Sequence, residues 1–343
     1  MNATPAVDEA AVERAARALA AGGLVAFPTE TVYGLGADAD NADAVRAIFA
    51  AKGRPADHPV IVHVLDASAI GPWSSGASAA AQALARAFWP GPLTLVLPRS
   101  PRAHDALTGG QSTVGLRCPA HPWARALLAA LCALRADASA ALAAPSANRF
   151  GRISPTTAAH VRADLGEKPD GRIDLILDGG PCPVGIESTI VDLSGTAPRL
   201  LRHGAVTRRQ IESAIGREVP DAGAGAPRAS GRLQSHYAPR APLELVSLPQ
   251  LSARLNAWRG TRLAVLAPAA ALLDPPPGVV LRLLSPSDPA EYARRLYALL
   301  HQLDECGAER ILVARPPRGE SWEAVHDRLG RAAAAAEPGD EGT

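Results

Sequence analysis

The sequence predicts two α/β domains joined by a linker. Short apolar runs alternate with stretches whose apolar residues recur at helical spacing, as in α/β proteins. Several early runs are separated by turns alone, which favours a mixed, twisted sheet with helices around it. The later runs each lead into a helix or a proline-rich turn, which predicts a small three-layer, Rossmann-like parallel α/β domain. We expect the first domain over residues 1–215, a linker or lid over 216–240 and the second domain over 241–343.

Local stop and start signals define the elements of the first domain. The first helix ends before Gly22 and Gly23, and Asn41 can cap a second helix that stops at Gly53. Pro28 ends the first strand, because it cannot donate to a sheet. We expect helices over 7–20, 42–52, 77–88, 122–134, 156–165 and 207–215, and strands over 24–27, 60–65, 93–97, 113–118, 142–144, 173–178, 187–193 and 200–202.

The pattern resumes after a stretch without periodicity, Asp221–Arg228, which is typical of a linker. Short Val, Leu and Ile runs then alternate with helical spacing. We expect strands over 243–246, 263–266, 279–283 and 311–314, and helices over 250–258, 289–306 and 322–334.

Bulk composition excludes several classes of protein. The chain has 343 residues, 47% hydrophobic and 20% charged, which is a globular composition and not a disordered one. Its net charge of +1 argues against direct binding of nucleic acid. No leader pattern and no apolar run of the ~20 residues needed to cross a membrane is present. The four cysteines form no C-x-x-C pair, so neither a zinc site nor a secreted disulfide framework is expected, and we predict a cytoplasmic protein.

The stretch Pro28–Gly36 and the nearby Lys52–Pro55 carry the strongest chemical signal. The first is a polar loop with two hydroxyls, a carboxylate and a phenol, and it is closed by two glycines. Lys52 and Arg54 lie at the end of a predicted helix. Hydroxyl donors and a cationic pair suit a phosphate-bearing ligand. The simpler alternative for the two cations is a solvated helix end, which the helix dipole favours.

Polar residues also gather where predicted strands end, and this is where α/β sheets form ligand sites. They are Thr31, His63, Thr113, Arg117, Ser146, Asn148 and the run Glu187–Thr189. Any one of them alone could be a helix cap or a packing residue. A buried arginine needs an anion, so Arg117 could pair with a ligand carboxylate, with Glu187 or with Asp192. Common signatures are absent: no dinucleotide fingerprint, phosphate loop, Gly-x-Ser-x-Gly elbow or His-Glu-x-x-His helix occurs.

Seven motifs together resemble the threonylcarbamoyl-AMP synthase family in its long form, which has a YrdC-like catalytic domain and a C-terminal domain. The motifs are Pro28–Gly36, Lys52–Pro55, Asp57–His63, Trp89–Thr94, Ala144–Asn148, Gly185–Ile190 and His236–Pro239. The resemblance runs from about residue 8 to 240, and beyond that it rests on position and pattern alone. It implies a YrdC-like mixed twisted sheet around a concave cleft.

The resemblance implies a nucleotidyltransferase that makes threonylcarbamoyl-adenylate and pyrophosphate from L-threonine, bicarbonate and ATP. A downstream transferase would use the product to modify the adenosine beside the anticodon of tRNA. By motif matching, Thr31, His63, Arg117, Ala144 and Ser188 would hold threonine. Arg54, His58, Thr113, Ser146, Ser154, Arg202, His236 and Tyr237 would hold ATP. Lys52 and Arg54 would act at the phosphates, and Mg²⁺ would enter with ATP and need few protein ligands.

Two departures from the family pattern bear on the ATP site. His58 stands where the family often has asparagine, and Ser230–Leu233 reads Ser-Gly-Arg-Leu where many members have Ser-Pro-Gly-Met. We still expect the linker to fold over the cleft as a lid. Two rival functions stay open: a non-catalytic RNA-binding or translation-associated module, and a carbamoyl-phosphate-handling enzyme of the hydrogenase-maturation kind. The first conflicts with the near-zero charge, and the second would need zinc-finger-like cysteines and an acylphosphatase-like segment.

Overall fold

The chain folds into two compact units in the computed structural model, which describes residues 4–223, 225–231, 236–260, 262–271 and 277–334. The first unit comprises residues 1–150 and 154–232, and the second comprises 151–153 and 233–343. The described part of the predicted linker up to residue 231 therefore belongs to the first unit, and residues 236–240 belong to the second. Arg232 and Leu233, which are part of the stretch that departs from the family pattern, lie outside the described residues.

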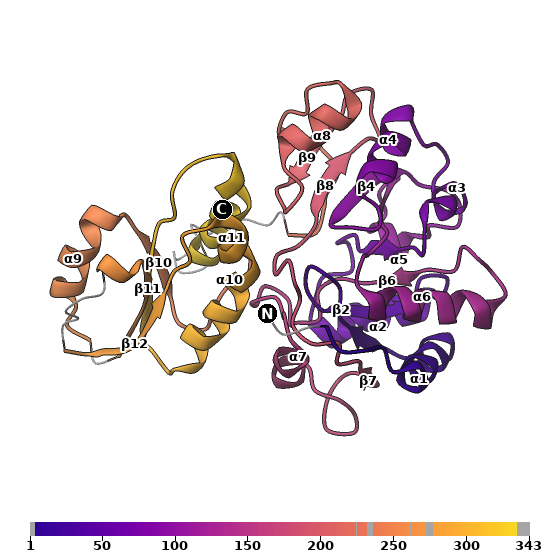
Figure 1. The fold of residues 1–343 in the computed structure, drawn as a ribbon. Coiled ribbons are helices and arrows are strands. Elements are labelled where there is room, and N and C mark those ends of the chain that lie inside the picture. The colour runs from indigo at the N-terminus through magenta and orange to yellow at the C-terminus, as the bar shows by residue number, and fades with distance from the viewer. Residues whose placement is uncertain (1–3, 224, 232–235, 261, 272–276, 335–343) are drawn as a thin grey trace, which may run out of the picture. The chain divides into compact units, whose positions relative to one another are not determined.

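Helices and strands alternate along the first unit (Figure 1). The helices are α1 (Glu9–Ala20), α2 (Ala42–Lys52), α3 (Ile70–Trp73), α4 (Ala79–Phe88), α5 (Asp105–Thr108), α6 (Pro122–Arg135), α7 (Ala158–Asp164) and α8 (Arg208–Ile215), with a 3-10 turn at Ala67–Ala69. The strands are β1 (Val25–Phe27), β2 (Gly34–Asp38), β3 (Ile61–His63), β4 (Leu93–Pro98), β5 (Thr113–Arg117), β6 (Leu142–Ala143), β7 (Leu175–Ile176), β8 (Thr189–Asp192) and β9 (Arg199–Arg202).

The strands of the described first unit form one nine-stranded sheet in the order β7-β1-β2-β6-β3-β5-β4-β8-β9. Three pairs are parallel (β1 with β7, β3 with β5, β4 with β8) and the others are antiparallel, so the predicted mixed sheet is confirmed. The short connections between β1 and β2 and between β8 and β9 explain why these two pairs are antiparallel, because a parallel pair needs a longer crossover.

Apolar side chains cover the two faces of this sheet unequally. On one face, Val62, Leu95 and Leu116 join α2, α4 and α8 in the main core. On the opposite face, α1 and α6 pack only over the β1 and β6 region, where Phe27 and Leu142 belong to their cluster. Alternation along β3 and β5 sends their remaining side chains to this second face. The second face is therefore open to polar residues beyond α1 and α6.

Strand β2 is a correction to the sequence prediction, which treated Pro28–Gly36 as a loop throughout. Gly34 and Gly36 instead begin a strand that pairs antiparallel with β1, in the register Phe27↔Gly34 and Val25↔Gly36. A Cβ at Gly36 would come within 2.9 Å of the Phe27 ring, so this strand needs glycine to lie against β1. Short helices α3 and α5 were also not predicted. By contrast, α2 spans the predicted residues, with Asn41 as its cap and Gly53 in the left-handed conformation at its end.

The second unit is a three-layer α/β domain, as the sequence predicts. Its elements are β10 (Leu243–Val246), α9 (Leu248–Ala257), β11 (Leu263–Ala267), β12 (Val279–Leu284), α10 (Pro289–Glu305), β13 (Arg310–Ala314) and α11 (Glu323–Ala334), with 3-10 turns at Ala269–Ala271 and Glu320–Trp322. In its described residues, four strands form an all-parallel sheet in the order β10-β13-β11-β12. Helices α10 and α11 lie on one face of this sheet and α9 on the other (Figure 1).

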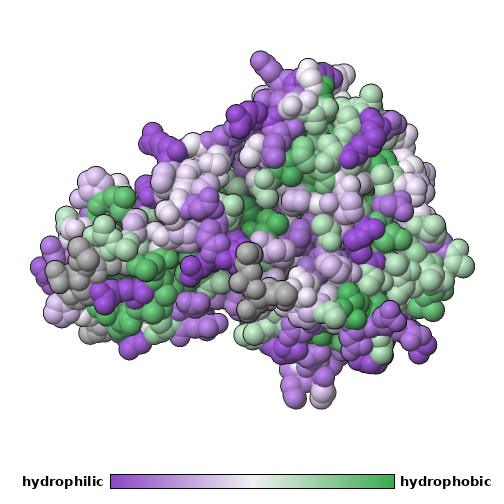
Figure 2. All heavy atoms as spheres, viewed as in Figure 1, coloured by the Kyte–Doolittle hydropathy of each residue, from purple (hydrophilic) through white to green (hydrophobic). Residues whose placement is uncertain are grey.

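Hydrophilic and hydrophobic side chains are interspersed over the side of the surface in view (Figure 2). Within the described residues, no helix has both the length and the apolar content that crossing a bilayer requires.

Candidate active site

A row of polar side chains crosses the open face of the nine-stranded sheet. His63 of β3 lies opposite Arg117 of β5, and Ile190 of β8 lies opposite Arg202 of β9. Between them, the register Leu95↔Leu116 brings Thr94 of β4 beside Arg117. His63, Arg117, Thr94 and Arg202 are all buried. Residues far apart in the sequence therefore meet at one height of the sheet, where the sequence predicted a ligand site.

Arg117 pairs with Glu30, which lies in the loop between β1 and β2. The Arg117 Nη2 donates to Glu30 Oε1 at 2.7 Å, and the two side chains are 5% and 7% exposed. This corrects the expectation that Glu187 or Asp192 would be the protein partner. The Arg117 Nε is also buried, and it has no hydrogen-bond partner among the described residues. Because nearly all buried polar atoms in proteins are bonded, this nitrogen marks a place for a ligand or water.

His63 is a neutral imidazole beside this pair. Burial, together with the nearby charge of Arg117, lowers the pKa of His63 to about 3. Its ring meets Phe27 edge to face at 6.1 Å between centroids. Its Nδ1 is buried and, in the part of the chain that the structure describes, bonds to nothing. His63 therefore supplies an uncharged polar atom, not a cation, to the site.

The loop between β1 and β2 is fixed by its own hydroxyls. Thr29 Oγ1 donates to the Val32 carbonyl at 2.6 Å, and it lies 2.9 Å from Thr31 Oγ1. Thr31 is fully buried. Ala144, the other small residue predicted for the threonine site, follows β6 and donates its N–H to the Ile61 carbonyl at 2.9 Å. Both predicted residues thus have defined backbone positions.

Ser188 directly precedes β8 and lies in a network of hydroxyl and guanidinium groups. Its Oγ is 2.7 Å from Thr94 Oγ1 and accepts from Arg202 Nη2 at 3.1 Å. Arg202 also donates through Nε to the Ser188 carbonyl at 2.9 Å and through Nη1 to the Ser230 carbonyl at 2.8 Å. The network therefore links the predicted threonine residue Ser188 to the predicted ATP residue Arg202 and to the linker.

The described part of the linker that belongs to the first unit lies on the same face of the sheet. Arg54 Nη2 donates to the Pro59 carbonyl at 2.7 Å and to Ser230 Oγ at 3.2 Å. Ala222 and Ala229 pack with Val96 and Ile190 of the sheet. Ser230 also borders a small hollow of about 20 Å³ that is lined in part by Thr113 and Thr94. In this conformation, Ser230 contacts both arginines predicted to bind ATP, Arg54 and Arg202.

Lys52 does not lie free at a helix end. Its ammonium donates to the carbonyl oxygens of Ser146 (2.6 Å) and Asn148, and burial lowers its pKa well below the usual value. The simpler alternative of a solvated end is therefore wrong for Lys52, which is 3% exposed. Lys52 instead holds the turn that carries the predicted ATP residue Ser146.

The remaining predicted ATP residues are distributed over both units. The His58 ring meets Phe150 edge to face at 5.5 Å, and Ser154 Oγ donates to Glu187 Oε1 at 2.6 Å. His236 and Tyr237 belong to the second unit. There the Tyr237 ring lies 5.6 Å below the Arg328 guanidinium and 5.5 Å from the ring of Tyr297. Tyr237 has a positive φ of 62°, a conformation that its packing must support.

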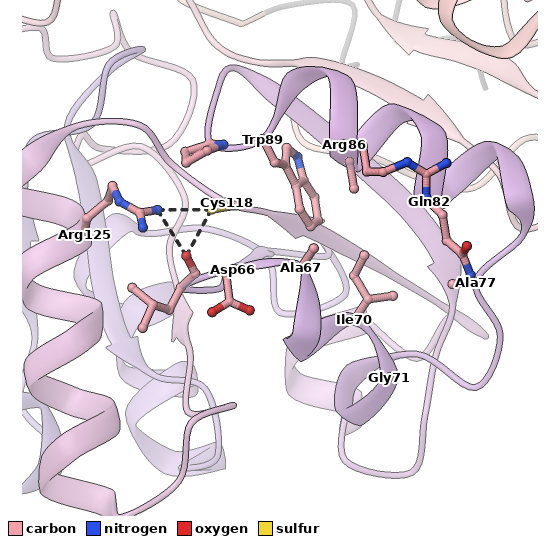
Figure 3. Close-up of a pocket in the computed structure, with 13 residues that line it drawn as sticks. Asp66, Ala67, Ile70, Gly71, Ala77, Gln82, Arg86, Trp89, Cys118 and Arg125 are labelled. Carbon is pink, nitrogen blue, oxygen red and sulfur yellow. Dashed lines mark hydrogen bonds between the residues drawn. The ribbon is translucent and has the colours of Figure 1, made fainter.

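A second, larger hollow of about 670 Å³ lies elsewhere in the first unit, between α6 and the α3 and α4 region (Figure 3). Arg125 donates there to the Leu65 carbonyl at 3.1 Å and to Cys118 Sγ at 3.4 Å. Trp89 and Ile70 form apolar parts of its wall. None of the predicted site residues lines it. Its size therefore does not make it the candidate active site, because none of the buried polar residues His63, Thr94, Arg117 and Arg202 lines it.

Sequence reasoning did not assign a role to two residues of the site, Glu30 and Thr94. Both stand inside motifs that the sequence analysis quoted, Pro28–Gly36 and Trp89–Thr94. The requirement that a buried arginine has an anion pointed to some acid, and alternation along β4 points Thr94 to the same face as Val96. What the sequence lacked was the register that brings Thr94 beside Arg117.

Comparison with known proteins then identifies the family. A family model described as "Telomere recombination" matches residues 17–204, and one described as "Threonylcarbamoyl-AMP synthase, C-terminal domain" matches residues 206–334. The chain is 46% identical to a threonylcarbamoyl-AMP synthase of Bacillus subtilis over 239 residues, which cover 68% of this chain and 66% of the relative. The chain belongs to the threonylcarbamoyl-AMP synthase family.

Further relatives of the threonylcarbamoyl-AMP synthase family agree in sequence and structure. The synthase of Pyrococcus abyssi is 41% identical over 255 residues, covering 73% of this chain and 72% of the relative. A crystal structure of P. abyssi Sua5 complexed with L-threonine matches 97% of this chain and 96% of that chain, with 34% identity and a TM-score of 0.86. The expected family and fold are therefore confirmed, and the relatives' shared name is that of a nucleotidyltransferase-type enzyme. These findings do not favour the non-catalytic RNA-binding alternative.

Proposed function

We propose that this chain is a threonylcarbamoyl-AMP synthase that uses L-threonine, bicarbonate and ATP and releases pyrophosphate. The observation that carries the proposal is the buried polar row on the open sheet face. There, Arg117 Nε and His63 Nδ1 have no hydrogen-bond partner among the described residues, although both are buried. The P. abyssi relative that matches this fold was solved with L-threonine. A polar amino acid bound on this face would satisfy such atoms.

Threonine would be held by its two ends. Arg117 would bind the carboxylate through Nε, since Nη2 already serves Glu30. The hydroxyls of Thr31 and Ser188 are candidates for the substrate hydroxyl, with His63 as a neutral neighbour and Ala144 leaving room for the methyl group. A site that hydrogen-bonds a substrate hydroxyl discriminates strongly against analogues that lack it.

ATP would occupy the neighbouring part of the face, where Ser230 now engages two arginines. Arg54 and Arg202 supply guanidinium groups for phosphate oxygens, and the ligand would replace or rearrange their contacts with Ser230. Thr113, Ser146, Ser154 and His58, all of the first unit, stay candidates for the rest of the nucleotide. Lys52 would act indirectly, by fixing the turn that carries Ser146.

The reaction requires alignment more than proton transfer. Bicarbonate and the threonine amine give a carbamate and water; a carbamate oxygen then bonds to the α-phosphorus as the bond to pyrophosphate breaks. Holding the two substrates in line and neutralising phosphate charge are the main requirements. No three His, Cys, Asp or Glu side chains cluster in the described residues as metal ligands would. We therefore propose that Mg²⁺ enters with ATP, bound mainly by phosphate oxygens and water.

We also propose that the product passes to a tRNA threonylcarbamoyl transferase and that the protein works in the cytoplasm. Four cysteines that are free thiols, three of them buried, suit a reducing compartment. Direct tRNA binding is not part of the proposal, because the net charge is +1.

Pyrophosphate release tests the function. The full chain is incubated with ATP, Mg²⁺ and bicarbonate and with each amino acid in turn, and the adenylate is identified by mass spectrometry. Threonine should give the fastest release, and omitting bicarbonate should abolish it. Release that does not depend on threonine would overturn the proposal, and salt-dependent RNA affinity without ATP turnover would favour the RNA-binding module.

A further inference from the structure

We propose that Glu30 is a positioning residue of the threonine site, which sets the orientation of Arg117 without touching the substrate itself. The inference rests on the proposed function, since it concerns the same site. Glu30 Oε1 accepts from Arg117 Nη2 at 2.7 Å, and Oε2 accepts from the Ala120 N–H at 3.0 Å. Both carboxylate oxygens are therefore engaged by the segment that runs from β5 toward α6.

Glu30 is itself held on its other side. Its carbonyl oxygen accepts from the Val184 N–H at 2.8 Å, and the preceding Thr29 makes the hydroxyl bond that closes the turn. Glu30 is thus fixed by backbone contacts from two other segments, Ala120 at its carboxylate and Val184 at its carbonyl oxygen, and its carboxylate can act as a reference point for a long side chain. Without such a contact, the long Arg117 side chain would keep its rotamer freedom. A fixed partner is therefore needed to orient its guanidinium.

The contact leaves a defined donor for the ligand. With Nη2 on Glu30, the Arg117 Nε stays buried and unbonded among the described residues. The same loop places Thr31 directly after Glu30, and Thr31 is fully buried. One loop therefore sets both the arginine that would take the threonine carboxylate and a hydroxyl that would take the other end of the substrate.

Charge alone predicts the opposite effect of removing Glu30, which makes the inference testable. A neutral residue at position 30 would leave Arg117 with more net positive potential, and this would tighten the binding of any carboxylate. By contrast, loss of the orientation of the Arg117 guanidinium would weaken the binding of threonine. The pair is nine-tenths buried, so an Arg117 side chain without its carboxylate partner is expected to move toward another anion or toward solvent.

The experiment compares the unchanged full chain with three variants: Glu30→Gln, Arg117→Gln and the double variant. For each protein, calorimetry gives the threonine affinity, and steady-state kinetics gives KM for threonine and KM for ATP. We expect Glu30→Gln to weaken threonine binding roughly tenfold or more, the lower end of what outer-shell partners contribute at other sites. KM for ATP should stay within about twofold of its value in the unchanged protein, because the orientation of Arg117 affects only the binding of the threonine carboxylate. The double variant should be no worse than Arg117→Gln, since Glu30 acts only through that arginine.

Glu13→Gln is the matched control, because Glu13 pairs with Arg17 on the exposed surface of α1, and its threonine affinity should equal that of the unchanged protein. Unchanged or tighter threonine binding in Glu30→Gln, additive losses in the double variant, or equal changes in both KM values would overturn the inference. If Glu30→Gln fails to fold, Glu30→Asp keeps the charge but shortens the reach, and undiminished threonine affinity there would also overturn it. A failure of the proposed function itself would show separately, as no threonine binding in the unchanged protein.

Discussion

The two sheets of this molecule are built from similar apolar runs but treat their faces differently. In the second unit, β11 is buried along its whole length, Leu263–Ala267, and every one of its side chains is apolar. In the first unit, β5 is likewise largely buried, but it ends at Arg117, and β3 beside it ends at His63. The inner strand β11 of the small sheet therefore buries apolar side chains alone, whereas strands of the large sheet also bury charged and polar side chains.

That difference teaches where to look for function. Burying polar atoms without partners costs free energy, which a fold tolerates where a ligand or water will satisfy them. The sheet of the second unit can be explained by its apolar core, Leu263, Leu312 and their neighbours, whereas Arg328 and the Tyr292 hydroxyl, which are buried polar groups of that unit, lie on its helices. The open face of the first sheet cannot be explained by packing alone. Four substitutions can break or sharpen this comparison.

The largest effect is expected from Arg117→Ala. The substitution removes the partner of the substrate carboxylate and leaves Glu30 buried without its cation, so threonine binding should weaken by roughly 2–5 kcal/mol. Calorimetric titration with threonine measures this. Arg46→Ala, which removes an arginine from a surface pair with Asp43, is the control and should bind normally. Threonine affinity that survives the loss of Arg117 would remove this residue from the site.

A core substitution in the second unit should lower the stability of the protein without changing its affinity for threonine. Leu312 is 2% exposed in β13, which pairs with strands on both sides, so Leu312→Ala should lower the free energy of unfolding by about 2–4 kcal/mol. Threonine affinity of the folded protein should stay the same. Urea unfolding and calorimetry give the two quantities, and Leu284→Ala, at a position 57% exposed in β12, is the control. A parallel loss of threonine affinity would mean that the small sheet is not merely a scaffold.

His63 predicts a specific pH dependence of stability. Its folded pKa of about 3 lies below the ordinary value of 6.5, so the unfolded chain binds a proton in this window and the folded chain does not. Its contribution is present above pH 6.5 and is lost progressively as the pH falls toward 3. Between pH 7 and pH 5, this single group should account for a loss of about 2 kcal/mol. Unfolding of His63→Asn at both pH values should show a correspondingly smaller loss, and an identical slope would mean that His63 protonates freely in the fold.

The smallest effect is expected from Ser188→Ala. The substitution removes an oxygen that lies 2.7 Å from Thr94 Oγ1 and accepts from Arg202, while the backbone contact of Arg202 with the Ser188 carbonyl stays. Threonine binding should weaken by about 1 kcal/mol, the usual net worth of one hydrogen bond. Competition between threonine and analogues without the hydroxyl should become less selective. If selectivity is unchanged, another group recognises the substrate hydroxyl.

Much of the fold could be predicted because its signals are local. Helix α2 was predicted residue for residue, since Asn41 and Gly53 are strong end signals, and the strands of the second unit follow from their Val, Leu and Ile runs. Strand β2 could not be predicted, because Gly34–Asp38 has little strand propensity of its own. Its structure comes from pairing with β1 and β6, which is a tertiary effect.

The candidate site likewise has residues that could be predicted from local patterns and contacts that could not. Alternation placed Arg117 on one face with Thr113, and strand ends pointed to His63, so both were found from the sequence. The pairing of Arg117 with Glu30 joins residues 87 positions apart, and Lys52 reaches carbonyls 94 and 96 positions away. No local pattern encodes such contacts. The binding roles given to the site residues stay predictions until a ligand is seen on this face.

A crystal structure with threonine and a non-hydrolysable ATP analogue tests the central claim most directly. Arg117 Nε should then lie within hydrogen-bonding distance of the threonine carboxylate, at about 2.7–3.2 Å, while Nη2 keeps its contact with Glu30. Threonine bound away from the open face of the sheet, with Arg117 Nε still unbonded, would contradict the account.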